Sequence, residues 1–529
     1  MLKFNKFIVL SLLLLSGCTN TNNSRTSSSN VSSISTSTST SSSSASSSST
    51  SIITSNKYND VIYDGYYQAV EQSVYFKDVR KSYLFKNDLP SIGDQKILVV
   101  PVKFTDSTYV DSSLGGHDKV KSDLEKMFFG NESETGWESV ASFYNQSSYG
   151  KLNLTGKVSD WCELDMTFSQ AANIKLPATI ATPTVYLARE VGKWYLENYD
   201  DASEYDLDKN GYIDALWMVY DWPANHSTAI DWAHCYWDYT NTDEVDINNP
   251  IPYTYAWASA GFMYEGKYFD ENNIPLVDAR TYIHETGHML GLDDYYDTDN
   301  KHSYAGCLDM MDYNIGDHNM FSKYLLNWAN PYVVTDDCEI TIRPSHSSGD
   351  FIIVKDNWNH SSTDEYLLIE FYTPTGLNEM DAKESYMDEY PLMYQNPGIK
   401  IYHIDARLGY FANYRFSKYT DEIIGVEGND AFSTRLAHSN TASINAQSGI
   451  FNSYYLLHLL ENEENPKLHG TRVPATDNTL FHEGDVFDPY YHEICFTTPE
   501  YFNDGEFISY TIEVSSLSME NATIKFTRL

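Results

Sequence analysis

Two histidines that flank a glutamate give this chain its clearest chemical signal. His284 and His288 are four residues apart, so on a helix their imidazoles lie on one face and can reach a single metal ion. Glu285 follows the first histidine, where it can act as general base toward a water molecule on a zinc ion. Gly291 suits the left-handed turn that ends such a helix, after which Asp294 can reach the open side of the metal. This HExxHxxGxxD spacing predicts a zinc site with ligands His284, His288 and Asp294.

A metal-free pair of helix histidines is the alternative interpretation of this pattern. A bare HExxH arises by chance in roughly a few per cent of proteins of this length. The added glycine and aspartate lower that frequency to on the order of one in ten thousand. We therefore expect the metal site.

A second run of acidic residues predicts a calcium-binding loop. Carboxylate and amide oxygens alternate around Gly211, as they do in loops that wrap a hard cation. A complete EF-hand would place a glutamate at the twelfth position, which here is Trp217, so a helix–loop–helix sensor is not expected. The alternative is an ordinary polar turn that leads into a strand. The expected ligands are the side chains of Asp206, Asp208, Asn210 and Asp214 and the carbonyl group of Tyr212.

The composition indicates a globular protein with much β structure. Of the 529 residues, 42% are hydrophobic and 15% aromatic, and 43 are tyrosines. The net charge of −39 argues against nucleic acid or an anionic membrane surface as a partner. Beyond Cys18, the cysteines are few, widely spaced and odd in number, which argues against a disulfide scaffold.

The N-terminal residues have the features of a bacterial lipoprotein signal. Lys3 and Lys6 precede an apolar run, 7–15, that is too short to span a bilayer. The run ends in Leu15-Ser16-Gly17-Cys18, which resembles a lipobox and implies cleavage before Cys18 with a lipid on its thiol. A plain signal peptide with an incidental cysteine is the alternative. Residues 19–56 are almost wholly Ser, Thr and Asn, so we expect a disordered tether.

The segments before the HExxH helix alternate between strand and helix patterns. Apolar, β-branched runs predict strands at 97–104, 215–220 and 253–262. Apolar residues at helical spacing predict helices at 120–128, 140–144 and 182–195. An α/β order that ends in a zinc helix is typical of a zincin catalytic domain, with its site in a cleft under a sheet edge.

After about residue 332 the pattern changes to short alternating runs separated by polar turns. These runs are 339–343, 351–354, 365–372, 398–403 and 509–527. Such a pattern indicates an antiparallel sandwich-like domain.

With these motifs, the chain resembles the immune inhibitor A family of secreted, metzincin-like zinc endopeptidases. The resembling segments are 97–106, 139–158, 206–221, 284–297 and 316–331, with a weaker likeness at 365–372 and 398–405. Family members commonly have a proline before the acidic ligand, where this chain has Asp293. Either Asp293 or Asp294 could thus be the third ligand, and the family spacing selects Asp294.

By the same resemblance, residues 307–313 correspond to the metzincin Met-turn. Met311 would lie beneath the metal, and Tyr313 would ligate it or donate a hydrogen bond to the developing oxyanion. Met310 is a rival for Met311, and each of these residues could equally be an ordinary core side chain.

The sequence therefore predicts an α+β, metzincin-like zincin catalytic domain followed by an all-β, sandwich-like C-terminal domain. The expected segments are a lipoprotein signal peptide with its lipobox (1–18), a Ser/Thr-rich tether (19–56), a possible pro-segment or leading strand (57–90), a zinc metallopeptidase domain (91–334) and a β-sandwich-like domain (335–529).

The expected function is that of a zinc-dependent endopeptidase, either lipid-anchored at Cys18 on the outer face of a bacterial cell membrane or secreted. We expect Zn²⁺ as the cofactor with Ca²⁺ as a second candidate, and protein or peptide substrates as partners. No nucleic acid, no membrane contact beyond the lipid and no second copy of the chain are expected. An extended substrate would pair with 253–262 as an edge strand. The alternative is a surface binding protein with a vestigial zincin domain and a ligand-binding sandwich, against which the intact Glu285 argues.

Overall fold

The computed structural model describes most of the chain from Lys57 onward. The described residues are 57–81, 88–131, 133–176, 180, 182–199, 201–239, 245–266, 268–270, 272–273, 275–388, 390–424, 432–463, 466–468, 470–492 and 496–529. The expected signal peptide, lipobox and tether lie outside this range. Among the described residues, no helix is long and apolar enough to cross a membrane. Cys162, Cys235, Cys307 and Cys338 are free thiols.

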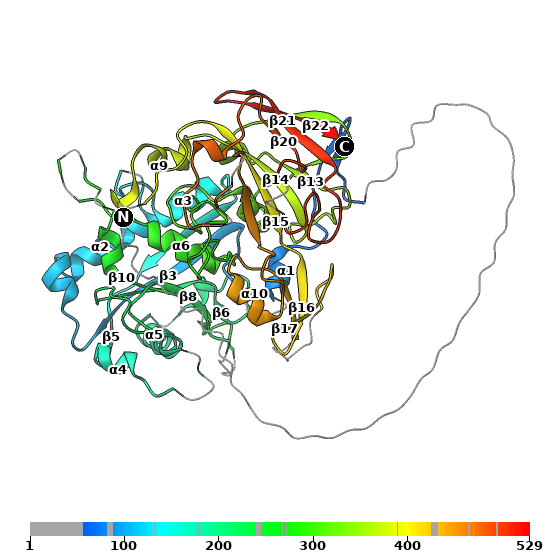
Figure 1. Cartoon of the computed structure of the whole chain (residues 1–529). Coiled ribbons are helices and arrows are strands. Elements are labelled where there is room, and N and C mark those ends of the chain that lie inside the picture. Colours follow the sequence, from blue (N-terminus) through cyan, green and yellow to red (C-terminus); the bar gives the residue numbers. More distant parts are fainter. Residues whose placement is uncertain are drawn as a thin grey trace, which may run out of the picture. The chain divides into compact units, whose positions relative to one another are not determined.

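The helix that contains the HExxH motif packs against a mixed β-sheet (Figure 1). Its strands lie in the order β4 (Leu152–Val158), β3 (Gly93–Phe104), β7 (Leu216–Tyr220), β10 (Thr254–Ser259) and β8 (His234–Trp237), and β5 (Cys162–Leu164) also pairs with β3. The pairs are parallel except that β8 runs antiparallel to β10 and forms one edge. The predicted strands at 97–104 and 215–220 are confirmed as β3 and β7. The strand predicted at 253–262 is confirmed as β10 over Thr254–Ser259, after which the chain forms a 3-10 helix, Ala260–Tyr264.

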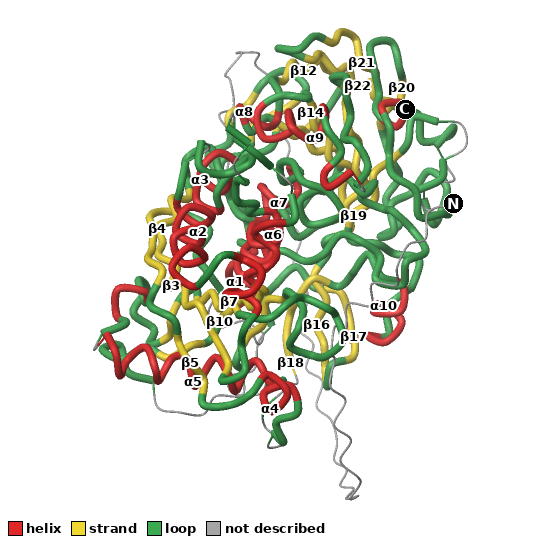
Figure 2. Tube along the Cα trace, turned by 90° about the vertical axis from the view of Figure 1, so that its left-hand side faces the viewer, coloured by secondary structure: helices red, strands yellow, loops and turns green. Residues whose placement is uncertain are grey.

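Helices pack on both faces of this sheet because successive strand residues point to opposite sides. One apolar core joins the sheet to α2 (His117–Phe129), α3 (Val140–Ser147) and α6 (Arg280–Met289), three neighbouring helices in Figure 2. A second core joins its other face to α4 (Phe168–Ala172) and α5 (Pro183–Tyr199). Trp217 belongs to the first core and its neighbour Leu216 to the second. The predicted helices are confirmed as α2, α3 and α5.

A seven-stranded sheet forms the centre of the C-terminal part. Its strands lie in the order β1 (Val61–Ile62), β2 (Tyr66–Gln68), β11 (Tyr332–Val334), β13 (Phe351–Val354), β14 (Glu365–Tyr372), β15 (Gly398–Asp405) and β19 (Leu457–Leu460). A third apolar core joins it to a four-stranded antiparallel sheet of β12 (Cys338–Ile342), β22 (Ala522–Arg528), β21 (Tyr510–Leu517) and β20 (Val486–Phe487). The alternating runs predicted after residue 332 are therefore confirmed as strands.

Smaller elements complete the described fold. The helices are α1 (Phe76–Lys81), α7 (Met320–Leu325), α8 (Ser345–Ser348), α9 (Glu379–Lys383) and α10 (Ala442–Ser448). The remaining strands are β6 (Tyr212–Ile213), β9 (Ile251–Pro252), β16 (Leu408–Ala412), β17 (Arg415–Tyr419) and β18 (Phe432–Leu436). This mixture of helices and separate sheets confirms the general α+β class.

The segments 57–90, 91–334 and 335–529 contribute to shared packing. β11 pairs with β2 on one side and with β13 on the other. The carboxamide oxygen of Gln72 accepts a hydrogen bond from the Ser362 hydroxyl at 2.8 Å, across 290 residues of sequence. Tyr58–Leu529 consequently forms one compact unit, into which the first described residues enter as leading strands and a helix.

A buried ion pair at α7 provides a test of this packing. Lys323 Nζ lies 2.6 Å from Asp317 Oδ2, and their side chains are 1% and 5% exposed. Lys323→Met would leave the carboxylate buried without its cation, so we expect the free energy of unfolding to fall by about 3 kcal/mol or more. Denaturant unfolding measures this loss. The matched control is Lys467→Met, which removes a pair with Glu463 whose lysine is 61% exposed, and it should cost less than about 1 kcal/mol. Equal losses of unfolding free energy in the two variants would contradict the buried Lys323–Asp317 ion pair.

Candidate metal centre and active site

The helix α6 begins at a carboxylate cap and ends at a glycine turn. The carboxylate of Asp278 accepts a hydrogen bond from the Arg280 backbone N–H at 2.9 Å, a donor that has no partner inside the helix. At the other end, Gly291 has a φ of +101°, which glycine adopts without a steric penalty. On the buried side, a Cβ atom at Gly287 would lie 2.5 Å from Met311 Sδ. Glycine at that position thus lets the helix approach the turn that carries Met311.

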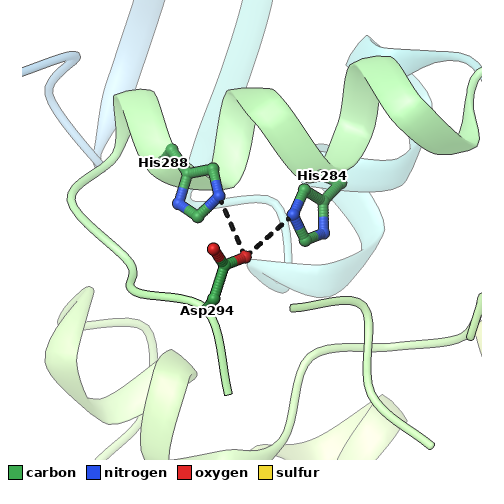
Figure 3. A group of neighbouring side chains, drawn as sticks. All are labelled: His284, His288 and Asp294. Carbon is green, nitrogen blue, oxygen red and sulfur yellow. Dashed lines mark hydrogen bonds and ion pairs between the residues drawn. The ribbon is translucent and has the colours of Figure 1, made fainter. Parts of the chain in front are cut away.

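His284, His288 and Asp294 converge on one point, as the spacing predicts. Figure 3 shows the two imidazoles projecting from α6 toward the carboxylate, which comes from the loop after the helix. Asp294 Oδ1 lies 3.1 Å from His284 Nε2 and 3.2 Å from His288 Nε2. The two imidazole planes are 89° apart. One ligand atom from each residue thus lies within 4.8 Å of the others, close enough for a single ion to join them.

Backbone carbonyl groups orient both imidazoles for metal binding. His284 Nδ1 lies 2.8 Å from the Met310 carbonyl oxygen, and His288 Nδ1 lies 2.8 Å from that of Leu292. A carbonyl oxygen can only accept, so each Nδ1 carries the proton and donates it. A cation bound between these groups would take the place of any proton on Nε2, and each Nε2 would then direct a lone pair at that cation. Two imidazoles and one carboxylate are a donor set that zinc accepts in catalytic sites.

The charges in this cluster reinforce one another. Burial disfavours a charged imidazole, yet the neighbouring Asp294 carboxylate raises the pKa of His288 to about 10. Burial likewise opposes ionisation of Asp294, but the two imidazoles hold its pKa well below the usual range. The cluster therefore favours positive charge at its centre.

Glu285 lies beside the cluster with an unpaired carboxylate oxygen. Its side chain is buried, and Oε2 has no hydrogen-bond partner among the described residues. Burial raises the pKa of Glu285, while the charges of His288 and His284 lower it. A buried carboxylate beside the metal ligands, unsatisfied and raised in pKa, suits a group that accepts and returns a proton.

Asp293 does not share this geometry with its neighbour. The Asp293 residue is exposed, and the charge of Arg80 acts on its carboxylate. Its carboxylate forms no ion pair with His284 or His288 among the described residues, whereas Asp294 contacts both. Of the two candidate third ligands, Asp294 is the one that the fold brings to the imidazoles.

The Met-turn candidates differ in the residues that they contact. Met310 and Met311 are fully buried. The Met310 carbonyl oxygen contacts His284, and the Met311 side chain packs against Gly287. Tyr313 packs instead against Tyr390, with ring centres 5.0 Å apart. The structure thus brings both methionines to α6, and it directs the Tyr313 ring toward the loop that carries Tyr390.

Tyr296 is a site residue that the sequence did not single out. Burial, the charge of Asp294 with a hydrogen bond to its side chain, and the charge of Glu285 raise the pKa of Tyr296 well above its usual value. The chain has 43 tyrosines, so type alone could not select this one. The sequence feature that could have identified it is its position two residues after Asp294.

The substrate edge predicted at 253–262 is wrong, because β10 lies between β7 and β8. Its backbone groups are paired on both sides, so it cannot accept a further strand. The edge is β8, which packs near α6. The four residues of β8 are too few to show an alternating pattern in the sequence.

The predicted calcium loop brings three carboxylates together. Oxygens of Asp206, Asp208 and Asp214 lie within 4.8 Å of one another. Asp214 is fully buried, and its Oδ1 has no hydrogen-bond partner among the described residues. Burial and the two neighbouring carboxylates raise the pKa of Asp214 to about 7. The Asn210 side-chain oxygen accepts a hydrogen bond from the Tyr212 N–H at 2.9 Å, so that oxygen shapes the loop.

Comparison with known proteins adds no relative to these observations. No protein-family model matches the chain, and no curated protein matches it significantly.

The third zinc ligand can be tested by paired substitutions. Asp294→Ala removes the carboxylate that contacts both imidazoles. Loss of a group that only orients a metal ligand lowers metal affinity about 10- to 100-fold, so loss of a ligand itself should lower zinc affinity by more than that. Asp293→Ala should retain most of the zinc. Zinc content after dialysis, measured by mass spectrometry, distinguishes the two. The opposite ranking would overturn the assignment of Asp294.

Calcium should stabilise the protein through the 206–214 loop. The three carboxylates repel one another unless a cation lies between them. We expect the melting temperature to rise by a few degrees on addition of calcium, as for any ligand that binds only the folded state. Asp214→Asn should abolish this rise, whereas Asp201→Asn, at an exposed position nearby, should preserve it. A melting temperature that does not respond to calcium would falsify the site.

Proposed function

We propose that this protein is a zinc-dependent endopeptidase of the metzincin-like kind that the immune inhibitor A resemblance implies. One observation carries the proposal: His284, His288 and Asp294 meet at one point, and the unpaired carboxylate of Glu285 lies beside them. A purely structural metal site closes its coordination with protein ligands and has no use for a free base, whereas a catalytic site keeps one position open.

A bound zinc ion would lower the pKa of a water molecule and polarise the carbonyl group of the scissile peptide bond. Glu285 would act as general base, taking a proton from the attacking water and giving it to the leaving amine. The buried position of Glu285 raises its pKa toward the range in which both transfers are efficient. The Tyr296 hydroxyl is hydrogen-bonded to the Asp294 side chain, whereas Tyr313 packs on Tyr390, so we assign Tyr296 as the donor to the developing oxyanion.

The edge strand β8 is the place we propose for an extended substrate. A peptide added to this edge would form main-chain hydrogen bonds and lie alongside α6. Main-chain pairing of this kind tolerates many side chains and suits an enzyme that acts on protein or peptide substrates.

We further propose a zincin-like arrangement for the helices and sheet around α6 and a sandwich-like arrangement for the C-terminal part. The core shared by the four-stranded and seven-stranded sheets supports the second assignment. The lipid anchor at Cys18, with placement outside the cell membrane, completes the proposal on sequence grounds. Calcium at the 206–214 loop would be structural, and we propose a monomer without nucleic-acid partners.

Substitution of the base tests the function directly. Glu285→Gln keeps the size of the side chain but removes its basicity, so hydrolysis of an unfolded protein by residues 57–529 should fall about 10²- to 10⁴-fold. Zinc content should remain unchanged, because Glu285 is not one of the converging ligands. A chelator should abolish wild-type hydrolysis. Glu163→Gln, at a side chain that is 56% exposed, is the control and should retain full activity. Hydrolysis that survives Glu285→Gln would rule out the mechanism.

A further inference from the structure

The N-terminal segment that precedes β3 lies directly against the end of α6. The Leu89 backbone N–H donates a hydrogen bond to the Met289 carbonyl oxygen at 2.9 Å. A carbonyl group in the last turn of a helix has no partner inside the helix, so Leu89 supplies a donor that α6 lacks. Phe76, Val79 and Leu89 are buried in the same apolar core as α6. This segment therefore supports the helix that carries both histidine ligands.

An ion pair within the segment packs against the turn that follows α6. Arg80 Nε donates to Asp88 Oδ2 at 2.7 Å and Arg80 Nη2 donates to Asp88 Oδ1 at 3.1 Å, so two hydrogen bonds join the guanidinium fork to the carboxylate. The two side chains are only 11% and 14% exposed. A Cβ atom at Gly291 would lie 3.0 Å from Arg80 Nε and 3.4 Å from Asp88 Oδ2, so both groups lie close to this turn. We call Arg80 and Asp88 the N-terminal ion pair.

The turn beside the N-terminal ion pair carries the group that orients His288. Leu292 follows Gly291, and its carbonyl oxygen lies 2.8 Å from His288 Nδ1. Asp294, the proposed third ligand, comes two residues later. A shift of Gly291 would therefore move both the carbonyl group that orients one ligand and the loop that supplies another.

The N-terminal ion pair also connects this turn with the edge strand β8. The indole N–H of Trp237, the last residue of β8, donates to Asp88 Oδ1 at 2.9 Å. The guanidinium carbon of Arg80 lies 5.2 Å from the ring centre of Trp237, within the range of a cation–π contact. Because the Asp88 carboxylate accepts from both Arg80 and Trp237, it fixes the position of β8 relative to the turn after α6.

The described part of 57–89 is packed as a permanent part of the fold. β2 pairs with β1 on one side and with β11 on the other, so it lies inside the seven-stranded sheet. Removal of the segment would expose the apolar side chains that it buries in the core. It would also leave β11 without β2 and the Met289 carbonyl group without its donor. A segment with these contacts is suited to support the metal site and not to be released from it.

We propose that Arg80 and Asp88 are positioning residues of the metal centre and that the segment that carries them is retained in the active protein. The N-terminal ion pair holds the Gly291 turn, and this turn keeps the ring of His288 directed at the metal. Groups that orient a metal ligand from outside contribute strongly to metal affinity. This inference rests on the proposed zinc site, to which it adds a part that comes from the N-terminal segment.

Substitutions of the N-terminal ion pair test this role through zinc binding alone. Arg80→Met keeps an unbranched apolar side chain but removes the fork, so the zinc dissociation constant should rise about 10- to 100-fold, measured by competition with a chromogenic chelator. Asp88→Asn removes the negative charge and should have a similar effect. Arg80→Lys keeps the positive charge without the fork and should give an intermediate value. Cobalt(II) bound in place of zinc should show a changed visible absorption in Arg80→Met, because that absorption depends on ligand geometry.

A matched variant separates positioning of the metal ligands from general stability. Lys355→Met breaks another ion pair, with Asp504, whose lysine side chain is 2% exposed and directly follows β13. It should destabilise the protein toward denaturant yet leave the zinc dissociation constant and the cobalt absorption nearly unchanged, with circular dichroism showing that each variant is folded. Equal losses of zinc affinity in Lys355→Met and Arg80→Met would overturn the positioning role. Unchanged zinc affinity in both Arg80→Met and Asp88→Asn would also overturn it.

The first residue of the active protein tests whether the segment is retained. Mass spectrometry of the purified, zinc-bound protein should place this residue before Phe76. Zinc-bound protein that hydrolyses substrate and begins after Leu89 would overturn retention of the segment. Wild-type protein that binds no zinc would overturn the metal centre together with this inference. Weakened zinc binding in Arg80→Met, combined with no hydrolysis by the wild type, would refute the peptidase proposal and leave the positioning role supported.

Discussion

The candidate site depends on one constraint: the Nε2 atoms of two imidazoles must be held close to one oxygen of the half-buried Asp294 carboxylate. A metal ion can bind all three groups only if the surrounding fold keeps them in this arrangement. The carbonyl oxygens of Met310 and Leu292 each fix one ring through Nδ1. The helix itself is held by side chains from other elements. The Tyr144 hydroxyl donates to the Ile283 carbonyl oxygen at 2.7 Å, and the Trp217 indole N–H donates to the Thr286 hydroxyl at 3.1 Å. The sheet and the neighbouring helices thus act on the site through α6.

The local parts of the site could be read from the sequence, and the parts set by tertiary packing could not. Helical spacing placed His284 and His288 on one face, and the glycine turn placed Asp294 within reach, because all three depend on neighbouring residues only. The strands β3, β7 and β10 were likewise visible as apolar runs, because a strand buried on both faces has no polar positions. The order of the strands in the sheet could not be predicted, because it depends on which strands pair and not on the residue pattern within a single strand. The edge position of β8 and the proximity of Tyr296 to Asp294 both required the packed structure.

Domain organisation shows the same limit. The change of pattern near residue 332 was real, because strands replace alternating helices and strands there. A change of pattern need not be a boundary between separately packed bodies, however. β11 lies just before the expected boundary and pairs with β13 just after it, so the two parts share a sheet as well as a core. The sequence reports which elements form, whereas the division into units depends on where their apolar faces meet.

The pairing of β2 with β11 has a consequence for the order in which this protein is assembled. β2 is among the first strands to emerge during synthesis, yet it contributes an inner strand of the seven-stranded sheet. Its partner β11 emerges only after the whole HExxH region, and Gln72 meets Ser362 across 290 residues. Closing so long a loop adds little free-energy cost over closing a shorter one, but it slows folding because distant segments must meet. The early strand therefore has β1 beside it from the start but lacks β11 on its other side until more than half of the polypeptide has been made. The N-terminal hairpin can thus join the seven-stranded sheet only as one of the last steps of folding, after the residues between β2 and β11 have been made.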